Sequence, residues 1–431
     1  MPPTPAQKRA SVLSDDLLAH LIAVGQVDVL VGLPTLDNAS TVSPVVLAIH
    51  EAIATFPRLR IALINSDGGS QDGTQERVRQ ASHGTAELLL ASHTLRTMHR
   101  VVAPFHGLPG RRAALQTIFA TAELLQPRAV LVVDASTVQP SPALFVTLVR
   151  RVLEGGFDFV GQAPVRDPRE GPLLSQFVRP LLRAVLGGCF EDPLGQQFAV
   201  SRAFASHVIG QPLWEDEVLR AGVDLALHAE ALAAGFATAQ LAVAPRERVL
   251  HPGRPGARET IQQVARALWL LLGRHERRWV EGPPAAPPTT IAVEEAAARE
   301  PAWDIAAAER SFREGVEQLR GVWPDILSAP VRTALATAVA AAPGGLPPDL
   351  WADVVCDMCV AWRARRFTPD QLAGAFVPLY MGRLAGFARE TTGLEARAAV
   401  TPLELVNQAL VDRRQMLAER WAAAASTGDP R

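Results

Sequence analysis

Lysine is almost absent from this chain: Lys8 is the only one among 42 basic residues, and all the others are arginine. The 44 acidic residues bring the formal net charge to -2, which argues against a broad nucleic-acid-binding surface. Alanine and proline are plentiful beside arginine, a combination that we interpret as a codon bias. The sequence therefore indicates no basic patch and no nucleic-acid partner.

Cysteine is also scarce, since Cys189, Cys356 and Cys359 are the only three and cannot form a disulfide framework. A chain of this kind suits a reducing compartment. The last two have the spacing of half a zinc site. Their apolar surroundings and the lack of a second Cys or His pair nearby favour two core cysteines one helical turn apart.

Long apolar runs are missing as well. The longest mainly apolar stretch, residues 265–272, contains Arg266 and is too short to span a bilayer. The amino terminus is polar and contains proline, so it does not resemble a signal peptide. We therefore expect a cytoplasmic protein without a membrane span.

At 431 residues and 48% hydrophobic, the chain is long enough for two or three domains with sizeable cores. Residues 1–26 are expected to form a tail and a helix. Buried strands alternate with helical segments over residues 27–280, which indicates an α/β fold with a doubly wound mixed sheet. The proline-rich residues 281–290 read as a linker, and residues 291–431 as a helical C-terminal domain.

The most informative stretch is residues 61–74, where four apolar residues, 61–64, lead through Asn65 and Ser66 to Asp67, two glycines and then Asp72. A strand buried on both faces belongs in a parallel sheet, and such sheets bind ligands at the carboxyl ends of their strands. The two glycines allow a sharp turn, and Asp72 is placed to cap the helix that follows. A plain solvated turn between strand and helix is the alternative interpretation.

Five features lie where strands pass into loops or helices, and their order resembles that of retaining GT-A glycosyltransferases. They are residues 34–42, Asp67 with Asp72, Gly110 with Arg111, residues 134–136 and residues 193–196, followed by Asp224 and His251. The resemblance covers roughly residues 27–275 and is greatest to mannosylglycerate synthases and glucosyl-3-phosphoglycerate synthases. It implies a GT-A, Rossmann-like catalytic domain that binds a nucleotide sugar.

The resemblance also implies a donor-binding set. Its members would be Pro34, Leu36, Asn38, Asp67, Gly110, Arg111, Asp134, Ala135 and Ser136. Leu36 and Asn38 would line the base, and Asp67 would accept a hydrogen bond from a ring N–H of the base. Arg111 would lie near the diphosphate, where a guanidinium can bind two oxygens at once. A surface arginine is the alternative for Arg111.

A divalent cation, Mg²⁺ or Mn²⁺, is part of the same implication, because carboxylate-held metals stabilise departing diphosphates. The implied ligands are Asp134, Ser136 and His251. The serine stands where the family has a second carboxylate, and a neutral hydroxyl is a weaker ligand, so we expect weak metal binding. His251 as an ordinary polar loop residue is an equal alternative.

The implied catalytic residues are Leu194, Gln196 and Asp224. The backbone carbonyl near Leu194 would face the anomeric carbon and stabilise a positively charged transition state. Gln196 would bind sugar hydroxyls, and Asp224 the donor sugar or the acceptor. A carboxylate in the first turn of a helix is equally explained by charge compensation. Arg166 would bind the carboxylate of the acceptor.

The sequence thus favours a retaining hexosyltransferase that moves a sugar from a UDP- or GDP-sugar to a small anionic acceptor such as glycerate or 3-phosphoglycerate. A homodimer is left open. One alternative is a catalytically weakened relative that binds a nucleotide or sugar, or scaffolds a partner; Asn38 and Ser136 favour it. The other is a sugar-phosphate nucleotidyltransferase, which the short glycine-bearing loop at residues 107–112 disfavours.

Overall fold

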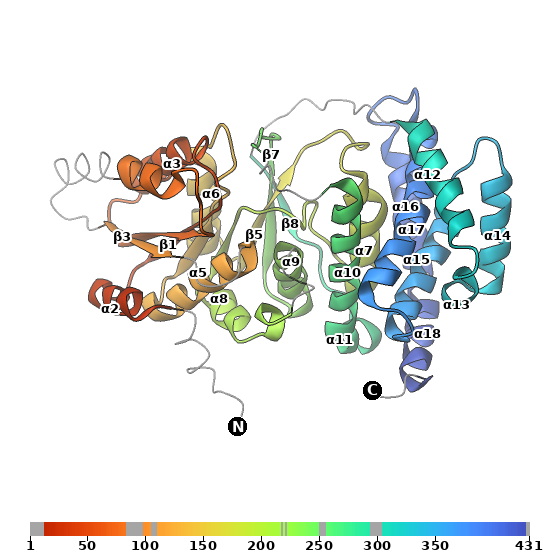
Figure 1. Ribbon diagram of the computed structural model, residues 1–431. Helices are drawn as coiled ribbons and strands as arrows, with labels where there is room; N and C mark the ends of the chain where they lie inside the picture. Colours follow the sequence, from red (N-terminus) through yellow and green to blue (C-terminus); the bar gives the residue numbers. More distant parts are fainter. Residues whose placement is uncertain are drawn as a thin grey trace. The chain divides into compact units, whose positions relative to one another are not determined.

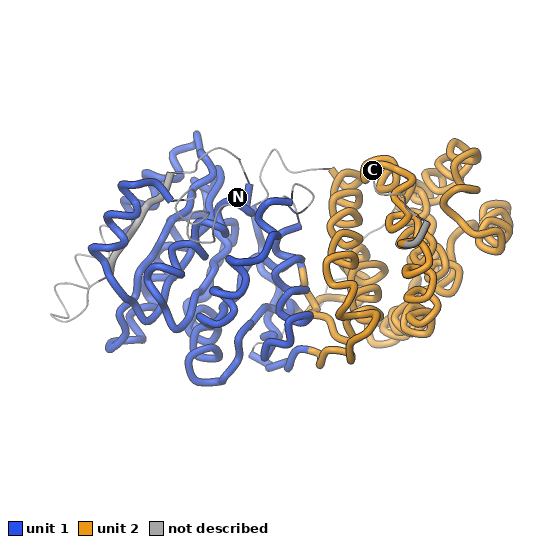
Figure 2. Tube along the Cα trace, turned by 90° about the horizontal axis from the view of Figure 1, so that it is seen from below, with its two compact units in different colours: residues 1–164, 194–254, 288–294 blue, residues 165–193, 255–287, 295–431 orange. Residues whose placement is uncertain are grey.

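The computed structural model describes residues 13–82, 98–104, 110–216, 219, 222–249, 256–293 and 304–427. The chain divides into two units, each assembled from segments that are far apart in the sequence (Figure 2). Unit 1 comprises residues 1–164, 194–254 and 288–294, and unit 2 comprises residues 165–193, 255–287 and 295–431.

The described part of unit 1 is built on an eight-stranded sheet in the order β3-β2-β1-β4-β6-β5-β7-β8. The strands are β1 (Val29–Thr35), β2 (Ile61–Asp67), β3 (Met98–Pro104), β4 (Ala129–Val132), β5 (Phe159–Pro164), β6 (Phe198–Ser201), β7 (Thr238–Val243) and β8 (Thr289–Ala292). Only β6 runs against its neighbours, β4 and β5. The doubly wound mixed sheet predicted from the sequence is confirmed.

Helices cover both faces of this sheet (Figure 1). One face carries α3 (Val42–Ala54) and α6 (Pro142–Leu153). The other carries α2 (Asp15–Val24), α5 (Arg111–Leu125), α8 (Arg202–Ile209) and α9 (Val223–Ala233). Alternation along β1 explains the packing: Val31 and Leu33 belong to the core under α3 and α6. Gly32 faces α5, where an added Cβ would lie 2.6 Å from Ile118.

The described part of unit 2 is almost entirely helical. Its main helices are α7 (Arg179–Leu186), α10 (Ala257–Arg274), α12 (Ile305–Gln318), α14 (Ala329–Ala340), α15 (Pro348–Arg363), α16 (Pro369–Thr391), α17 (Val400–Asp412) and α18 (Arg414–Thr427). A short π-helical turn, η1 (Leu174–Val178), precedes α7, and α11 (Glu276–Glu281) and α13 (Trp323–Ile326) are short. The helical C-terminal part predicted from the sequence is confirmed.

Aromatic contacts explain why two earlier segments belong to unit 2. Trp269 of α10 packs on Trp362 at 5.6 Å and on Phe376 at 5.6 Å between ring centroids. Phe177 packs on Phe376 at 4.5 Å. The sequence places residues 165–193 and 255–280 in the first domain, but their apolar side chains are buried among helices that follow residue 304.

Two smaller sequence expectations meet the structure here. Cys356 and Cys359 are buried in α15 as free thiols, and burial raises the pKa of Cys356 to about 12, as fits core residues. The end of the expected linker instead forms the edge strand β8, which pairs in parallel with β7. No helix among the described residues is long and apolar enough to cross a membrane.

Candidate functional site

The strand directions of unit 1 bring several loops to one edge of the sheet. β1, β2 and β4 run parallel, and β5 and β7 run the same way because β6 is antiparallel to both β4 and β5. The loops after β2, β4 and β7 therefore emerge at one edge. Residues 194–197 join them there, since they lead into the antiparallel strand β6.

Asp67, the last residue of β2, is completely buried at this edge. Its Oδ1 accepts from Thr35 Oγ1 at 2.8 Å and from Ser70 Oγ at 2.5 Å. Its Oδ2 accepts from Gln75 Nε2 at 2.7 Å and from two backbone amides, at residues 69 and 70. Burial raises the pKa of this carboxyl, but the donors outweigh it and leave the pKa lowered.

The same turn is joined to the loop after β1. Asp72 accepts from Thr74 N at 3.0 Å, as expected of a helix cap, and from Ala39 N at 2.8 Å. Asn38 N donates to Thr74 Oγ1 at 2.7 Å. Helix residues 74–82 follow directly. These contacts hold the predicted base-binding loop, in which Leu36 and Asn38 are half-buried and Pro34 is buried, against the turn of Asp67.

Asp134 and Ser136 form a compact pair just after β4. Ser136 donates to Asp134 Oδ1 twice, from its backbone N at 3.0 Å and from its Oγ at 2.7 Å. Asp134 is 8% exposed, and its own N donates to Gln197 Oε1 at 3.5 Å. Between them, Ala135 is buried, and its carbonyl accepts from Thr41 Oγ1 at 2.6 Å.

Arg248, from the loop after β7, binds this pair. Its Nε lies 2.7 Å from Asp134 Oδ2 and donates to Ser136 Oγ at 3.0 Å. Its Nη2 donates to Gln196 Oε1. The predicted partner from this loop was His251, which lies outside the described residues; the described contact comes from the arginine.

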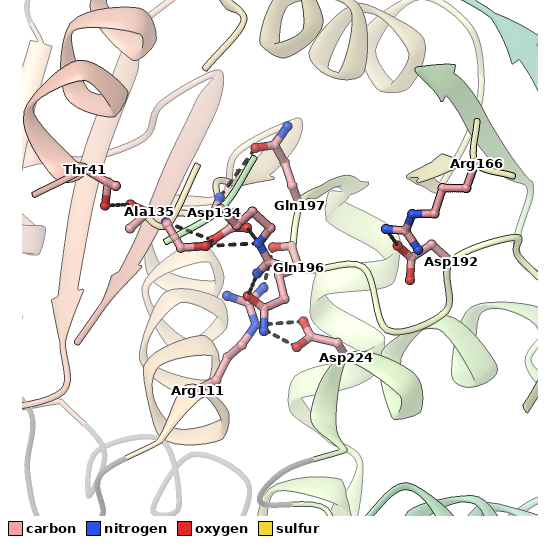
Figure 3. A network of polar contacts seen from close by, with 11 residues as sticks. Thr41, Arg111, Asp134, Ala135, Arg166, Asp192, Gln196, Gln197 and Asp224 are labelled. Carbon is pink, nitrogen blue, oxygen red and sulfur yellow. Dashed lines mark hydrogen bonds and ion pairs between the residues drawn. The ribbon is translucent and has the colours of Figure 1, made fainter. Parts of the chain in front are cut away.

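A second arginine–carboxylate pair joins α5 to α9. Arg111, the first residue of α5, donates from Nε to the two oxygens of Asp224, at 2.9 and 2.7 Å (Figure 3). Its Nη2 donates to the backbone carbonyl of Gln196. A cation at a helix N-terminus opposes the helix dipole, so Asp224 offsets an otherwise unfavourable charge. Gly110, with φ of 153°, precedes it in a conformation that favours glycine.

Gln196 connects the two pairs, because its backbone oxygen accepts from Arg111 and its side-chain oxygen from Arg248. Both carboxylates are mostly buried, with side chains 11% exposed for Asp134 and 9% for Asp224. The two guanidinium groups keep 38% and 17% exposure for Arg248 and Arg111. This arrangement can present two fixed cations to one doubly charged anion.

The described residues at this edge do not fit a divalent cation. Mg²⁺ and Mn²⁺ need several oxygen ligands, usually including carboxylates. Asp134 is the one carboxylate among the predicted ligands that the structure describes, and one of its oxygens already holds Arg248. No group of three or more His, Cys, Asp or Glu side chains in the described part of the chain could hold a metal ion.

Other expected site residues lie as follows. Leu194 is half-buried in the segment before β6. Arg166 belongs to unit 2, where its Nη2 donates to Asp192 Oδ2 at 3.1 Å. Residues 105–109 of the glycine-bearing loop lie outside the described residues. The structure thus brings together Arg111, Asp134, Ser136, Gln196 and Asp224 from the predicted set.

Sequence reasoning missed Arg248 and Gln197. Arg248 stands in a loop with two other charged residues, and nothing in the local pattern distinguishes it from Arg246. One signal was available: because Ser136 stands where the family has a second carboxylate, Asp134 is a single negative charge that one basic side chain can neutralise. An arginine in a nearby loop is a common partner for a lone carboxylate.

The fold and the site together define an α/β protein whose mixed sheet presents paired arginines and carboxylates at the carboxyl edge of its strands. No protein-family model matches the sequence. No curated protein matches it either. Solved structures that resemble the chain include those of glucosyl-3-phosphoglycerate synthase.

The Mycobacterium tuberculosis enzyme, solved with Mn²⁺, uridine diphosphate and phosphoglyceric acid, is 20% identical with a TM-score of 0.42, covering 60% of this chain and 81% of that one. The same enzyme solved with Mg²⁺ and uridine diphosphate is 20% identical with a TM-score of 0.42, covering 61% of this chain and 83% of that one. Another mycobacterial protein is 23% identical with a TM-score of 0.43, covering 61% and 78%.

Proposed function

We propose that the protein is a glycosyltransferase that moves a hexose from a nucleotide-diphospho-sugar to a small anionic acceptor such as glycerate or 3-phosphoglycerate. The observation that carries the proposal is the pair of guanidinium groups, Arg111 and Arg248, tied together by Gln196 at the sheet edge. A departing nucleoside diphosphate gains negative charge, and fixed cations stabilise that charge in the transition state.

The proposed reaction retains the configuration of the sugar. The bond from the anomeric carbon to the phosphate oxygen breaks, and the acceptor hydroxyl attacks the same face while its proton passes to that oxygen. A separate protein base is then unnecessary. The backbone near Leu194 would stabilise the positive anomeric carbon, and Gln196 Nε2 would donate to a sugar hydroxyl while its oxygen accepts from Arg248.

Recognition of the remaining groups follows the sequence expectations. Leu36 and Asn38 would line the base, and Asp67 would hold the loop that carries them or meet the base itself. Asp224, positioned by Arg111, would contact the sugar or the acceptor. We expect the enzyme to act in the cytoplasm, because its three cysteines are free thiols. A homodimer remains a prediction.

A second candidate is a binding protein without turnover, which senses a nucleotide or sugar or scaffolds a partner. The observation that favours it is the engagement of Asp134 by Arg248, which leaves this carboxylate unavailable for a metal. Such a protein would still bind nucleoside diphosphates. The two candidates therefore differ in turnover and agree in binding.

The test is release of free nucleoside diphosphate from UDP-glucose or GDP-mannose, with and without D-glycerate or 3-phosphoglycerate, in Mg²⁺, in Mn²⁺ and in EDTA. We expect acceptor-dependent release in the full chain and its loss in Arg111→Met. Arg128→Ala is the control, because this exposed arginine precedes β4 at the opposite end of the strand that leads to Asp134. A thermal shift with nucleotide but no release would favour the binding protein.

A further inference from the structure

A cation already lies where the sequence predicts a metal ion. Arg248 Nε is 2.7 Å from Asp134 Oδ2 and 3.0 Å from Ser136 Oγ, the two described residues of the predicted metal set. We propose that the Arg248 guanidinium is the resident counter-charge for the donor diphosphate, so that nucleoside diphosphates bind without a divalent cation. The inference rests on the proposed function, because it concerns the same site.

The backbone holds Arg248 in this position. Arg248 and Thr137 form an isolated antiparallel bridge between the loops that follow β7 and β4. Hydrogen bonds flank it on both sides, from Val138 N to Glu247 O at 3.0 Å and from Val249 N to Ser136 O at 2.9 Å. These backbone hydrogen bonds fix the position of the Cα of Arg248, from which its side chain extends. The contact with Asp134 is therefore built into the loop and does not depend on a long side chain finding it by chance.

Ser136 suits a guanidinium better than it suits a metal ion. Its Oγ donates a proton to Asp134 at 2.7 Å and accepts one from Arg248 at 3.0 Å, so both roles of the hydroxyl are used. A hard dication prefers charged oxygens, and a hydroxyl supplies none. The serine and the arginine therefore form a matched set around Asp134.

Charge balance points the same way. One carboxylate, Asp134, neutralises one guanidinium, whereas it would leave a dication with a net positive charge until the diphosphate binds. A metal ion bound to Asp134 would also lie beside the fixed positive charge of Arg248 and be repelled by it. The net charge of Asp134 and Ser136 thus matches one monovalent cation.

Arg248 also retains the means to bind an anion. A guanidinium has five N–H donors, and its contacts with other described residues use only Nε and Nη2. Its side chain is 38% exposed. The backbone oxygen of Gln196 accepts from Arg111, and its side-chain oxygen accepts from Arg248. Gln196 therefore fixes the separation of the two guanidinium groups. Two cations so linked suit the two phosphoryl groups of a diphosphate.

The test is calorimetric titration of the full chain with UDP and with GDP, in Mg²⁺, in Mn²⁺ and in EDTA. We expect the same dissociation constant in all three buffers. Arg248→Ala should weaken binding in EDTA by about 10- to 100-fold, the usual effect of losing a charged hydrogen bond. Arg128→Ala, which removes the same charge from the opposite edge of the sheet, should leave binding unchanged.

A gain-of-function variant makes the test sharper. Arg248→Ala combined with Ser136→Asp supplies two carboxylates and no competing cation, so its nucleotide binding should recover with Mn²⁺ and stay weak in EDTA. Thermal denaturation checks that each variant folds. Arg248→Gln, which keeps hydrogen-bonding groups but no charge, replaces Arg248→Ala should the latter unfold.

The outcomes separate the two proposals. Binding of the full chain only in Mg²⁺ or Mn²⁺ would overturn the role of Arg248 and leave the transferase proposal standing. Unchanged affinity in folded Arg248→Ala would do the same. Absence of UDP and GDP binding in every buffer would remove both proposals.

Discussion

Among single residues of the site, Asp67 is a carboxylate held entirely by hydrogen-bond donors. Its carboxylate is fully buried and accepts five hydrogen bonds from Thr35, Gly69, Ser70 and Gln75. A carboxylate has about four lone-pair positions, so these donors saturate it. Asp67 therefore acts first on the shape of the turn, and contact with a base would require one donor to move.

Asp67→Ala tests both roles. Removing the carboxylate leaves buried donors without a partner, so we expect the free energy of unfolding to fall by about 1–3 kcal/mol. Nucleotide binding should weaken by about 1–3 kcal/mol, whether through the base or through the loop. Urea unfolding and titration with UDP measure the two effects. Unaltered affinity in the folded variant would exclude Asp67 from the nucleotide site.

The lowered pKa of Asp67 makes a prediction about acid. A carboxyl whose pKa is lower in the folded state than in the unfolded chain stabilises the fold above the unfolded value and loses that contribution as the pH falls through the folded one. Stability should therefore decline below about pH 4, the ordinary range of an aspartate. Urea unfolding at several pH values should show a shallower decline in Asp67→Asn, and equal slopes would contradict the assignment.

At the scale of helices and strands, the contact between Arg111 and Asp224 links the first turn of α5 to the first turn of α9. The two helices connect to strands far apart in the sheet, since α5 follows the edge strand β3 and α9 precedes β7, next to the other edge. Both helices begin at the carboxyl edge: α5 follows β3 there, and α9 runs back from that edge to the start of β7. The pair thus fixes the spacing of two helix ends around Gln196.

A double-mutant cycle measures this link. Arg111→Ala, Asp224→Ala and the double variant should give a coupling energy of about 1–3 kcal/mol in the free energy of unfolding, because the two side chains are mostly buried and in direct contact. Asp224→Ala alone should cost more stability than the double variant, since it leaves Arg111 uncompensated at a helix N-terminus. Additive single effects would mean that the pair contributes no specific link.

The central strands of unit 1 could be predicted from local sequence pattern, whereas the edge strand β8 lies partly in the expected linker. Residues 61–64 form an apolar run that leads through Asn65 and Ser66 to Asp67, and the sheet buries every residue of that strand. The site was only half predictable. Arg111, Asp134 and Asp224 follow strand or helix boundaries, whereas the pairing of Arg248 with Thr137 joins two loops that are far apart in the sequence. No local pattern carries that information.

At the scale of the whole molecule, the same limit applies to unit membership. A proline-rich segment suggests a boundary near residue 281, yet residues 255–287 belong with the helices that follow. Trp279 shows the reason, since it packs on Trp421 with ring centroids 5.6 Å apart. Amphipathic periodicity shows that α10 has an apolar face without showing what covers it.

A chain that ends at residue 293 tests this division. If the predicted domain of residues 27–280 were self-contained, the truncated protein would unfold cooperatively and bind UDP. We expect instead that Trp269 and Trp279, which are 0% and 1% exposed in the full chain, become accessible to water and promote aggregation. Fluorescence of the tryptophans, binding of a hydrophobic dye and sedimentation measure this.

The matched control supplies the removed helices as a separate polypeptide. Residues 304–427 contain most of the helices of unit 2, including those that cover Trp269 and Trp279. Co-expression of residues 294–431 with the truncated chain should therefore bury both tryptophans again and recover solubility, because burial of large aromatic side chains stabilises such a contact strongly. A soluble, cooperatively folding truncation that needs no second fragment would contradict the assignment of α10 to unit 2.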